Sequence, residues 1–332
     1  MTENKSPRPF EVRPVETRPF ETWASASTMR SRVVIEIAAE LVAADQPLRQ
    51  ARVQLRAKGD DWPLNLYAGS TMEAIEQVAA GTAQLSMVNP AAILALACRG
   101  TGPFKAPLPL RTIGCIPSLD SFVFAVRGDL PLDTFEDIGR RKFPLKVSVR
   151  DQPEHCIHMM LDHVCAAAGF AARDIVVWGG ALRHEVRPRG PRWQPFESGA
   201  VDAIFDEAVD EWGEDAVGRG MKFLPLEPAT LSRLEAMGYR RSVISARSVA
   251  GLKADVVTLD FSGWPIYVRD DLPDALVARI CEALDARKHL IPWQGPGALP
   301  VERMAREAPD TPQAAPLHRA AERVWRERGY IA

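Results

Sequence analysis

The stretch that most constrains the fold covers residues 64–90 and reads LNLYAGSTMEAIEQVAAGTAQLSMVNP. It begins with a short apolar run of strand length, which Gly69 ends. Ser70, followed three residues later by Glu73, is typical of a capping box, so a helix is expected directly after the glycine. A second apolar run of strand length then leads to Asn89-Pro90. The stretch therefore predicts a strand, a turn, a helix and a strand.

The turn Gly69-Ser70-Thr71 is the first candidate for ligand contact. Backbone N–H groups at the start of a helix have no partner within the helix and attract an anionic group. Ligands of open α/β sheets collect at the carboxyl ends of the strands, which is where this turn is expected. We predict a small-molecule cleft with the turn on one wall; the alternative is that the turn only caps a helix.

The overall composition sets limits on size and partners. A chain of 332 residues exceeds what one core usually serves, so two lobes are expected. Hydrophobic residues at 46% and charged residues at 25% are typical of a soluble globular protein. A net charge of −2 argues against partners such as nucleic acid or an anionic membrane surface.

Cysteines and the N-terminal sequence indicate a compartment. The five cysteines are scattered without a CxxC pair, which favours reduced, buried thiols in a cytosolic protein. The N-terminus has no apolar core of the kind a signal peptide needs, and no run of about 18 apolar residues predicts a membrane span. The chain as written is therefore expected in the cytoplasm without direct membrane insertion. A periplasmic location would require that a native leader is missing.

Strands and helices alternate along the rest of the chain, which predicts βαβ units with mainly parallel sheets. Residues 1–18 are proline-rich and charged, so we expect a disordered arm. Two continuous apolar segments, residues 121–127 and 256–268, are interpreted as strands crossing between lobes. The predicted fold class is α/β, with two lobes whose sheets are flanked by helices and joined by two crossing strands. Lobe 1 would comprise residues 19–125 plus 264–332, and lobe 2 residues 126–263.

Within lobe 2 the pattern predicts alternating strands and helices and one irregular stretch. Strands are expected over residues 145–149, 175–178, 201–205 and 221–224, and a helix over residues 153–168 follows the first. Residues 179–195 are rich in Gly, Pro and Arg and are expected to be irregular.

The order of these segments resembles a known family. The residues that carry the resemblance are Gly69-Ser70-Thr71, residues 80–88 (AGTAQLSMV), Ser121–Arg127 leading to residues 135–139 (FEDIG), residues 198–205 (SGAVDAIF), and PLHRAA at 316–321 with ERGY at 327–330. Together they are similar to the type II periplasmic-binding-protein fold, and more narrowly to TAXI-type solute receptors of TRAP transporters. The resemblance implies binding of small organic acids or amino acids between two lobes, with hinge closure over the ligand. It also implies a membrane permease or a regulatory protein as partner. Several cytoplasmic relatives of this fold are enzymes, including aromatic-acid decarboxylases and lyases of menaquinone biosynthesis.

Further candidate residues are those expected where strands end, because strand ends should face the cleft. Polar groups there can hydrogen-bond a ligand, a glycine allows close backbone approach, and arginine captures carboxylates in a bidentate manner. Carboxylates can bind an amine or a hydroxyl group, and a tryptophan can stack on a planar ligand. The candidates are Asn89, Gln152, His155, Gly180, Arg183, Asp206, Glu207 and Trp264.

Each candidate also has an ordinary structural interpretation. Asn before Pro is a routine turn element, a basic loop is usually solvated, and Glu207 suits a helix N-terminus. His155 and His158 are one helical turn apart, but histidines on a helix face are far more often ordinary than metal ligands. No metal site and no cofactor are predicted. The motifs GxxxxGK[ST], GxGxxG, HExxH and GxSxG are absent from the sequence.

Two functions remain open. The first is a receptor that closes on a small anionic organic solute, a carboxylate or an amino acid. The alternative is a cytoplasmic decarboxylase or lyase acting on a carboxylated aromatic substrate, in which His155 or His184 would exchange a proton with Asp206 or Glu207. A regulatory sensor is not separable from the receptor by sequence.

Overall fold

The computed structural model describes residues 53–55, 64–66, 71–152, 155–185 and 193–332. The chain divides into two units, Met1–Ser70 and Thr71–Ala332. The described part of the first unit is an antiparallel pair of strands, β1 (Val53–Leu55) and β2 (Leu64–Leu66). The predicted arm at residues 1–18 and the turn residues Gly69 and Ser70 lie outside the described residues.

The second unit contains a three-stranded antiparallel sheet in the order β3-β12-β4. Its elements are β3 (Leu85–Met87), β4 (Leu110–Ile116) and β12 (Trp264–Arg269), with helices α2 (Thr71–Ala79), α3 (Ala91–Arg99), α10 (Asp274–Arg287) and α11 (Arg319–Glu327), and a short 3₁₀ helix η2 (Val301–Arg303). Buried side chains of β4, β12, α10 and α11 form one core. Within it the Trp325 indole donates to the Ile113 carbonyl at 2.7 Å, which holds α11 to β4.

A larger sheet in the same unit has the order β10-β11-β5-β8-β6-β7, with β9 also paired to β5. Its strands are β5 (Ser121–Arg127), β6 (Lys146–Arg150), β7 (Ala181–Glu185), β8 (Ala203–Asp206), β9 (Met221–Phe223), β10 (Arg241–Ile244) and β11 (Val256–Asp260). Its helices are α4 (Glu136–Arg140), α5 (Ile157–Ala167), α6 (Ala172–Val177), α7 (Trp193–Glu197), α8 (Val209–Gly218) and α9 (Pro228–Met237).

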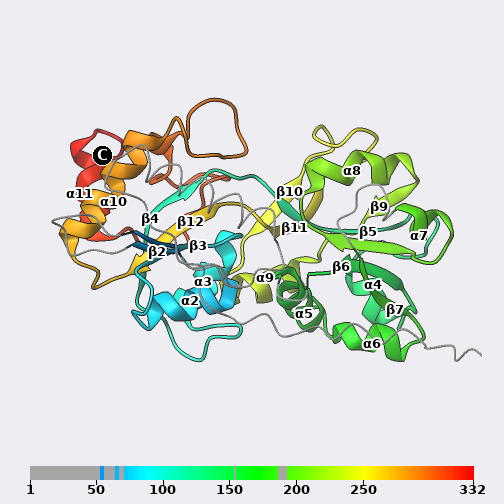
Figure 1. Ribbon diagram of the computed structural model, residues 1–332. Coiled ribbons are helices and arrows are strands. Elements are labelled where there is room, and N and C mark those ends of the chain that lie inside the picture. Colours follow the sequence, from blue (N-terminus) through cyan, green and yellow to red (C-terminus); the bar gives the residue numbers. More distant parts are fainter. Residues whose placement is uncertain (1–52, 56–63, 67–70, 153–154, 186–192) are drawn as a thin grey trace, which may run out of the picture. The chain divides into compact units, whose positions relative to one another are not determined.

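Strand β5 is buried on both faces, which explains its unbroken apolar sequence. Phe122, Phe124 and Val126 join the core that includes α4, α5 and α6. Val123 and Ala125 point to the other face, into the core that includes α7 and α8. The ribbon shows these helices covering the sheet (Figure 1). Successive side chains of a strand alternate between faces, so a strand covered on both sides reads as continuously apolar.

Two short segments carry the chain between the sheets. Residues 117–120 lead from β4 to β5, and residues 261–263 lead back from β11 to β12. The segments are hydrogen-bonded to each other, because the Gly263 N–H donates to the Ser118 carbonyl at 2.8 Å and the Phe261 N–H to the Asp120 carbonyl at 3.0 Å. We call residues 117–120 and 261–263 the crossing segments.

The predicted α/β class, with sheets flanked by helices, is confirmed. The prediction of mainly parallel sheets is wrong for the described strands, because only β6 with β7 and β6 with β8 pair in parallel. The predicted second crossing strand at 256–268 is two strands, since Gly263 adopts φ +77 and breaks the run. The lobe boundaries stay a prediction.

Two predictions near residue 180 are also wrong. Residues 175–178 were expected to form a strand, but Ala172–Val177 is helix α6, whose first turn gains a hydrogen bond from the Ala171 N–H to the Asp174 carboxylate at 2.8 Å. The strand lies instead at Ala181–Glu185, inside the stretch expected to be irregular.

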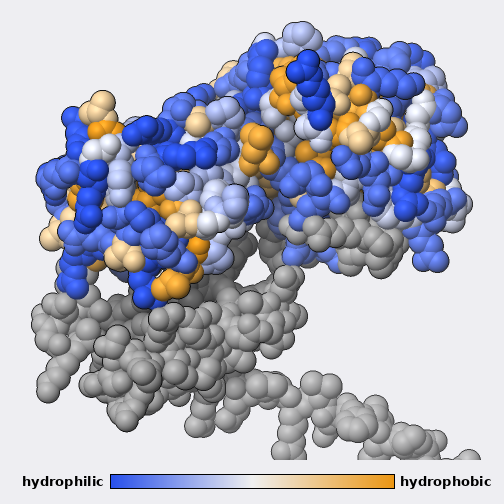
Figure 2. Space-filling view, turned by 90° about the horizontal axis from the view of Figure 1, so that it is seen from above, coloured by the Kyte–Doolittle hydropathy of each residue, from blue (hydrophilic) through white to orange (hydrophobic). Residues whose placement is uncertain are grey.

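The described surface in Figure 2 is mainly hydrophilic, with separate hydrophobic patches. Among the described residues, no helix has the length and apolar character needed to cross a bilayer.

Candidate functional site

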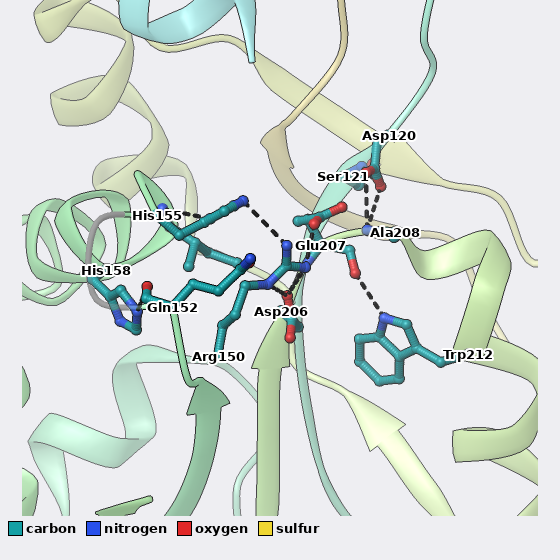
Figure 3. A network of polar contacts seen from close by, with 11 residues as sticks. Asp120, Ser121, Arg150, Gln152, His155, His158, Asp206, Glu207, Ala208 and Trp212 are labelled. Atoms are coloured by element: carbon teal, nitrogen blue, oxygen red, sulfur yellow. Dashed lines mark hydrogen bonds and ion pairs between the residues drawn. The ribbon is translucent and has the colours of Figure 1, made fainter. Parts of the chain in front are cut away.

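Arg150 is the centre of a buried network of charged groups. It is the last residue of β6, and only 1% of its surface is exposed. Its guanidinium donates from Nε and Nη2 to Asp206 Oδ1, at 3.1 and 2.6 Å. Nη2 also forms an ion pair with Glu207 Oε1 (Figure 3). An arginine buried this deeply is uncommon and is expected only where partners surround the charge.

The two acids follow from the pairing of parallel strands. Val147 lies opposite Ala203 and Ser148 opposite Ile204, so the same register brings the end of β6 level with the end of β8. Asp206 ends β8 and Glu207 follows it, and both are buried, with 0% and 4% exposed. The carboxyl ends of neighbouring parallel strands thus place one cation against two carboxylates.

His155 extends the network towards helix α5. Its Nε2 accepts a hydrogen bond from Arg150 Nη1 at 3.1 Å, an arrangement that requires Nε2 to carry no proton. The imidazole ring is parallel to the Phe261 ring at 6.3 Å between centroids, so a crossing segment packs against the histidine. The next residue, Cys156, donates from Sγ to the Asn89 carbonyl at 3.4 Å. Elements of both sheets therefore contribute to this neighbourhood.

Asp120 approaches the network from the first crossing segment. Its carboxylate accepts the Ala208 N–H through both oxygens, each at 2.9 Å, and the Ser121 N–H at 2.7 Å. A side-chain hydrogen bond also joins it to Glu207. Burial, followed by the negative charge of Glu207, raises the pKa of Asp120 well above its usual range. Asp120 therefore holds its proton more readily than an exposed aspartate does.

The network contains more acidic than basic side chains. Burial opposes the charge on Arg150, but the carboxylates of Asp206 and Glu207 outweigh it and the pKa of the guanidinium is raised. Burial and the Glu207 carboxylate raise the pKa of the Cys156 thiol to about 12. Cys156 is therefore an uncharged thiol at neutral pH and not an activated nucleophile.

The structure brings together three of the predicted site residues, His155, Asp206 and Glu207, and places the Asn89 backbone beside Cys156. Thr71 is the first residue of α2 and is half-buried. Gln152 has an exposed side chain, and its carbonyl accepts a hydrogen bond from His158 Nε2 at 3.0 Å. Whether any of these residues contacts a ligand stays a prediction.

Four other predicted residues lie in different surroundings. Gly180 was expected to end a strand, but it precedes β7, and an added Cβ would lie 2.3 Å from the Leu145 carbonyl oxygen. This glycine is needed for close packing against the start of β6, away from the end that carries Arg150. Arg183 and His184 are exposed on β7, and His184 Nδ1 lies 3.3 Å from the Arg150 carbonyl. Trp264 pairs with Ile116 in the small sheet and packs on the core beneath α10 and α11.

Sequence reasoning missed Arg150, Asp120 and Phe261. The rule that selected Asp206 could also have selected Arg150, which ends β6; the strand was predicted over residues 145–149, one residue too early. Asp120 precedes β5, and a rule based on carboxyl ends does not select it. Phe261 lay within an apolar run that was interpreted as a single strand.

In the described part of the chain, no three His, Cys, Asp or Glu side chains are grouped so that they could hold a metal ion. A hollow of about 140 Å³ is lined by Gly81, Ala83, Gln84, Arg269, Asp271, Leu272 and Pro273, and another of about 350 Å³ lies along α11. Neither hollow includes a residue of the Arg150 network.

No model of a protein family matches the chain, and no curated protein sequence matches it. Solved structures similar to the chain include XAC2383 from Xanthomonas citri bound to ATP, with 13% identity, 80% of this chain and 86% of that chain covered, and a TM-score of 0.39. The periplasmic aliphatic sulphonate binding protein SsuA from Escherichia coli has 14% identity, coverage of 66% and 57%, and a TM-score of 0.32. The glycine/betaine/L-proline-binding protein ProX from Borrelia burgdorferi has 13% identity, coverage of 67% and 76%, and a TM-score of 0.33. At these identities and TM-scores, the similarities assign neither a family nor a ligand to this chain.

Proposed function

We propose that the protein is a solute-binding protein that takes up a small organic ligand at the carboxyl ends of β6 and β8. The observation that carries this proposal is the buried Arg150, held by Asp206 and Glu207 and contacted by His155. Burying three charged groups costs free energy that a well-packed apolar core would not, so such a network is weak as a device for stability. At the carboxyl ends of neighbouring strands in an α/β protein, a binding role accounts for it.

The charges of the network favour a ligand with both a negative and a positive group. Arg150 can hold a carboxylate, but its charge is already opposed by Asp206 and Glu207, with Asp120 beside them. A purely anionic ligand would add to this negative surplus, whereas an amino acid would offer its carboxylate to Arg150 and its ammonium to the acids. Within the predicted class of small organic acids, we therefore propose an amino acid.

Burial of the network implies that ligand entry needs a conformational change. Arg150, Asp206 and Glu207 are at most 4% exposed, and the ring of Phe261 in a crossing segment lies parallel to the half-buried His155 ring. Bending at the crossing segments is the motion that would expose these groups, since both sheets of this unit are linked there. The ligand would favour the closed form through contacts that only this form makes.

The test is a thermal-shift screen in which each amino acid is paired with the carboxylic acid that lacks its amino group, such as glutamate with glutarate. Hits are then titrated by calorimetry against His155→Gln, with His289→Gln, at an exposed histidine after α10, as the control. We expect an amino acid to stabilise the protein more than its paired acid, and His155→Gln alone to weaken binding, by about tenfold for one lost hydrogen bond. The proposal fails if no compound stabilises the protein, or if both histidine variants bind like the wild type.

A second candidate function is a decarboxylase or lyase, favoured by the raised pKa of Asp120, whose carboxyl group contacts Glu207 next to Arg150. Arg150 could hold the substrate carboxylate before it leaves as carbon dioxide, and a carboxyl group with a raised pKa is suited to deliver a proton to the carbanion that remains. Aromatic carboxylic acids are therefore included in the screen, and every stabilising compound is incubated with the protein and analysed by NMR. Loss of carbon dioxide or water, abolished in His155→Gln, would select the enzyme over the receptor.

A receptor of the TAXI type would deliver its solute to a membrane permease, and a sensor would act on a regulatory protein instead. The gene neighbourhood separates these partners from the enzyme. An adjacent permease gene would support the receptor, a regulatory gene the sensor, and genes of aromatic catabolism the enzyme.

A further inference from the structure

Asp120 connects two regions that the proposed function requires to move together. Its backbone belongs to the first crossing segment, where its N–H donates to Ser262 Oγ at 3.0 Å and its carbonyl accepts from the same hydroxyl at 3.0 Å. Its carboxylate points to the turn after β8 and binds the Ala208 N–H through both oxygens (Figure 3). One residue thus contacts both crossing segments and the turn.

The turn at residues 206–208 carries the two acids that hold Arg150. Its conformation is constrained, because Ala208 has φ +63, a left-handed backbone that residues other than glycine rarely adopt. The Glu207 N–H donates to Asp206 Oδ1 at 2.9 Å, and the Glu207 carbonyl accepts from the Trp212 indole at 2.7 Å. The hydrogen bonds from the Ala208 N–H to Asp120 attach this turn to the crossing segment.

We propose that Asp120 is a positioning residue that couples the crossing segments to the 206–208 turn, so that movement at the crossing segments displaces the acids around Arg150. This inference rests on the proposed function, since coupling matters only if the network binds a ligand. It explains why a carboxylate is buried at this position. An amide at the start of α8 could be satisfied by water, but water would not transmit a displacement from Ser262 to Ala208.

The proposed coupling depends on whether the Asp120 carboxyl group is protonated. The charged and titratable groups around the Asp120 and Glu207 carboxyls come from several elements. Arg150 of β6 forms an ion pair with Glu207, Asp206 accepts the Glu207 N–H, and the Cys156 thiol before α5 interacts with the Glu207 charge. His155 binds Arg150, and Asp260 at the end of β11 accepts the N–H of Ser262, which contacts the Asp120 backbone. Because the pKa of Asp120 is raised by burial and by Glu207, the folded protein holds this proton more tightly than the unfolded chain. The contribution of Asp120 is most favourable at acidic pH. It is lost progressively as the pH rises from the ordinary aspartate value through the raised one.

The experiment is hydrogen–deuterium exchange by mass spectrometry on the full chain, read at peptides covering residues 206–212. Asp120→Ala should raise exchange there about tenfold, the change that loss of one hydrogen bond to a carboxylate implies, while Asp120→Asn keeps an acceptor and should protect like the wild type. Asp215→Asn, an exposed acid on α8, is the control.

The same peptides are followed as a function of pH, with each exchange rate divided by the intrinsic rate at that pH. Protection in the wild type should fall as the pH rises, and Asp120→Asn should remove this dependence.

Ser262→Ala separates coupling from simple capping of the turn. It removes the hydroxyl that holds the Asp120 backbone and leaves the Asp120 carboxylate intact. Coupling requires faster exchange at both residues 117–121 and 206–212 in this variant; a change confined to the crossing segments overturns the proposal, even if Asp120→Ala does not fold. These readouts need no ligand. If Ser262→Ala changes exchange at both segments but no compound in the screen binds, the proposed function is refuted and the coupling stands. If a compound binds but exchange at residues 206–212 does not change, the coupling is refuted and the proposed function stands.

Discussion

Arg150 illustrates how one residue can be essential to folding and costly at the same time. Its guanidinium contacts Asp206, Glu207 and His155 in a region with almost no exposed surface. Removing one partner of a buried ion pair lowers stability more than replacing the whole pair with apolar residues does, because the remaining charge stays buried without a partner. We predict that Arg150→Met lowers the free energy of unfolding by about 3–5 kcal/mol, measured by urea denaturation at pH 7.

The matched control for this prediction is Arg183→Met, on the neighbouring strand β7, where the arginine side chain is exposed. Surface substitutions of this kind usually change stability by no more than about 0.5 kcal/mol. Equal losses in the two variants would show that Arg150 is not held by the buried carboxylates, and the central contact of the candidate site would then be wrong.

At the residue scale, sequence reasoning reached the acids of the site more easily than its base. Asp206 and Glu207 follow an apolar strand, and acids after a strand stand out against an apolar background. Arg150 does not stand out, because arginines are mostly exposed and the sequence around it is already polar. Gly180 was predicted to allow close approach of a ligand to the backbone. The group that approaches it closely is the backbone of Leu145, directly before the neighbouring strand β6.

The turn between β8 and α8 is the element whose geometry constrains the site most directly. Ala208 has a left-handed backbone, and such a conformation costs a residue with a Cβ about 1–2 kcal/mol. Glycine removes this cost but has about 0.5–1 kcal/mol more conformational entropy to lose on folding, so we predict that Ala208→Gly leaves stability nearly unchanged or slightly raised. Ala208→Val should destabilise by about 1–3 kcal/mol, because a β-branched residue is a genuine outlier there.

The control lies in the helix that follows. Ala216 is within α8 and buried, so Ala216→Gly should lose about 1 kcal/mol of stability in urea denaturation through helix propensity, and roughly 0.8 kcal/mol more because its packed methyl group is removed. The same substitution is thus expected to be harmless at one position and harmful at another in the same element. A loss at Ala208→Gly as large as that at Ala216→Gly would contradict the strained turn.

At the element scale, hydrophobic patterning found most helices and strands but could not decide short apolar runs. Residues 175–178 contain Ile and Val and favour a strand by propensity, yet they lie within or next to α6. The deciding interaction is the bond from the Ala171 N–H to Asp174, which supports the first turn of a helix. Strand direction was also beyond the pattern, because β5 is covered on both faces as a parallel strand would be, yet pairs in the antiparallel sense.

At the scale of the whole molecule, the sequence predicted that the chain passes between lobes near residues 126 and 263, and the structure has its crossing segments at 117–120, before β5, and at 261–263. It could do so because each crossing adjoins a long apolar strand, which is a strong signal in a single sequence. It could not show how tightly the crossing segments are joined. That depends on contacts between residues more than 140 positions apart, such as Asp120 with Ser262, separated by 142 positions.

Gly263, in the second crossing segment, is constrained by its backbone conformation and by its close neighbours. It has φ +77, and a Cβ added to it would lie 2.6 Å from Pro312 Cδ and 2.8 Å from Cys115 Sγ. Gly263→Ala therefore incurs both the left-handed backbone cost of about 1–2 kcal/mol and an overpacking cost of about 1–3 kcal/mol. Gly297→Ala is the matched control, because its φ is +74 and an added Cβ would meet nothing within 4 Å.

Urea denaturation followed by circular dichroism should show the larger loss of stability for Gly263→Ala, with the difference from Gly297→Ala measuring the overpacking alone. The clash with Pro312 and Cys115 would push the second crossing segment away from Ser118, which accepts the Gly263 N–H. Equal losses in the two alanine variants would mean that the crossing segment yields freely. A crossing that yields freely would not transmit movement to the acids around Arg150, because Ser262 would no longer fix the position of Asp120.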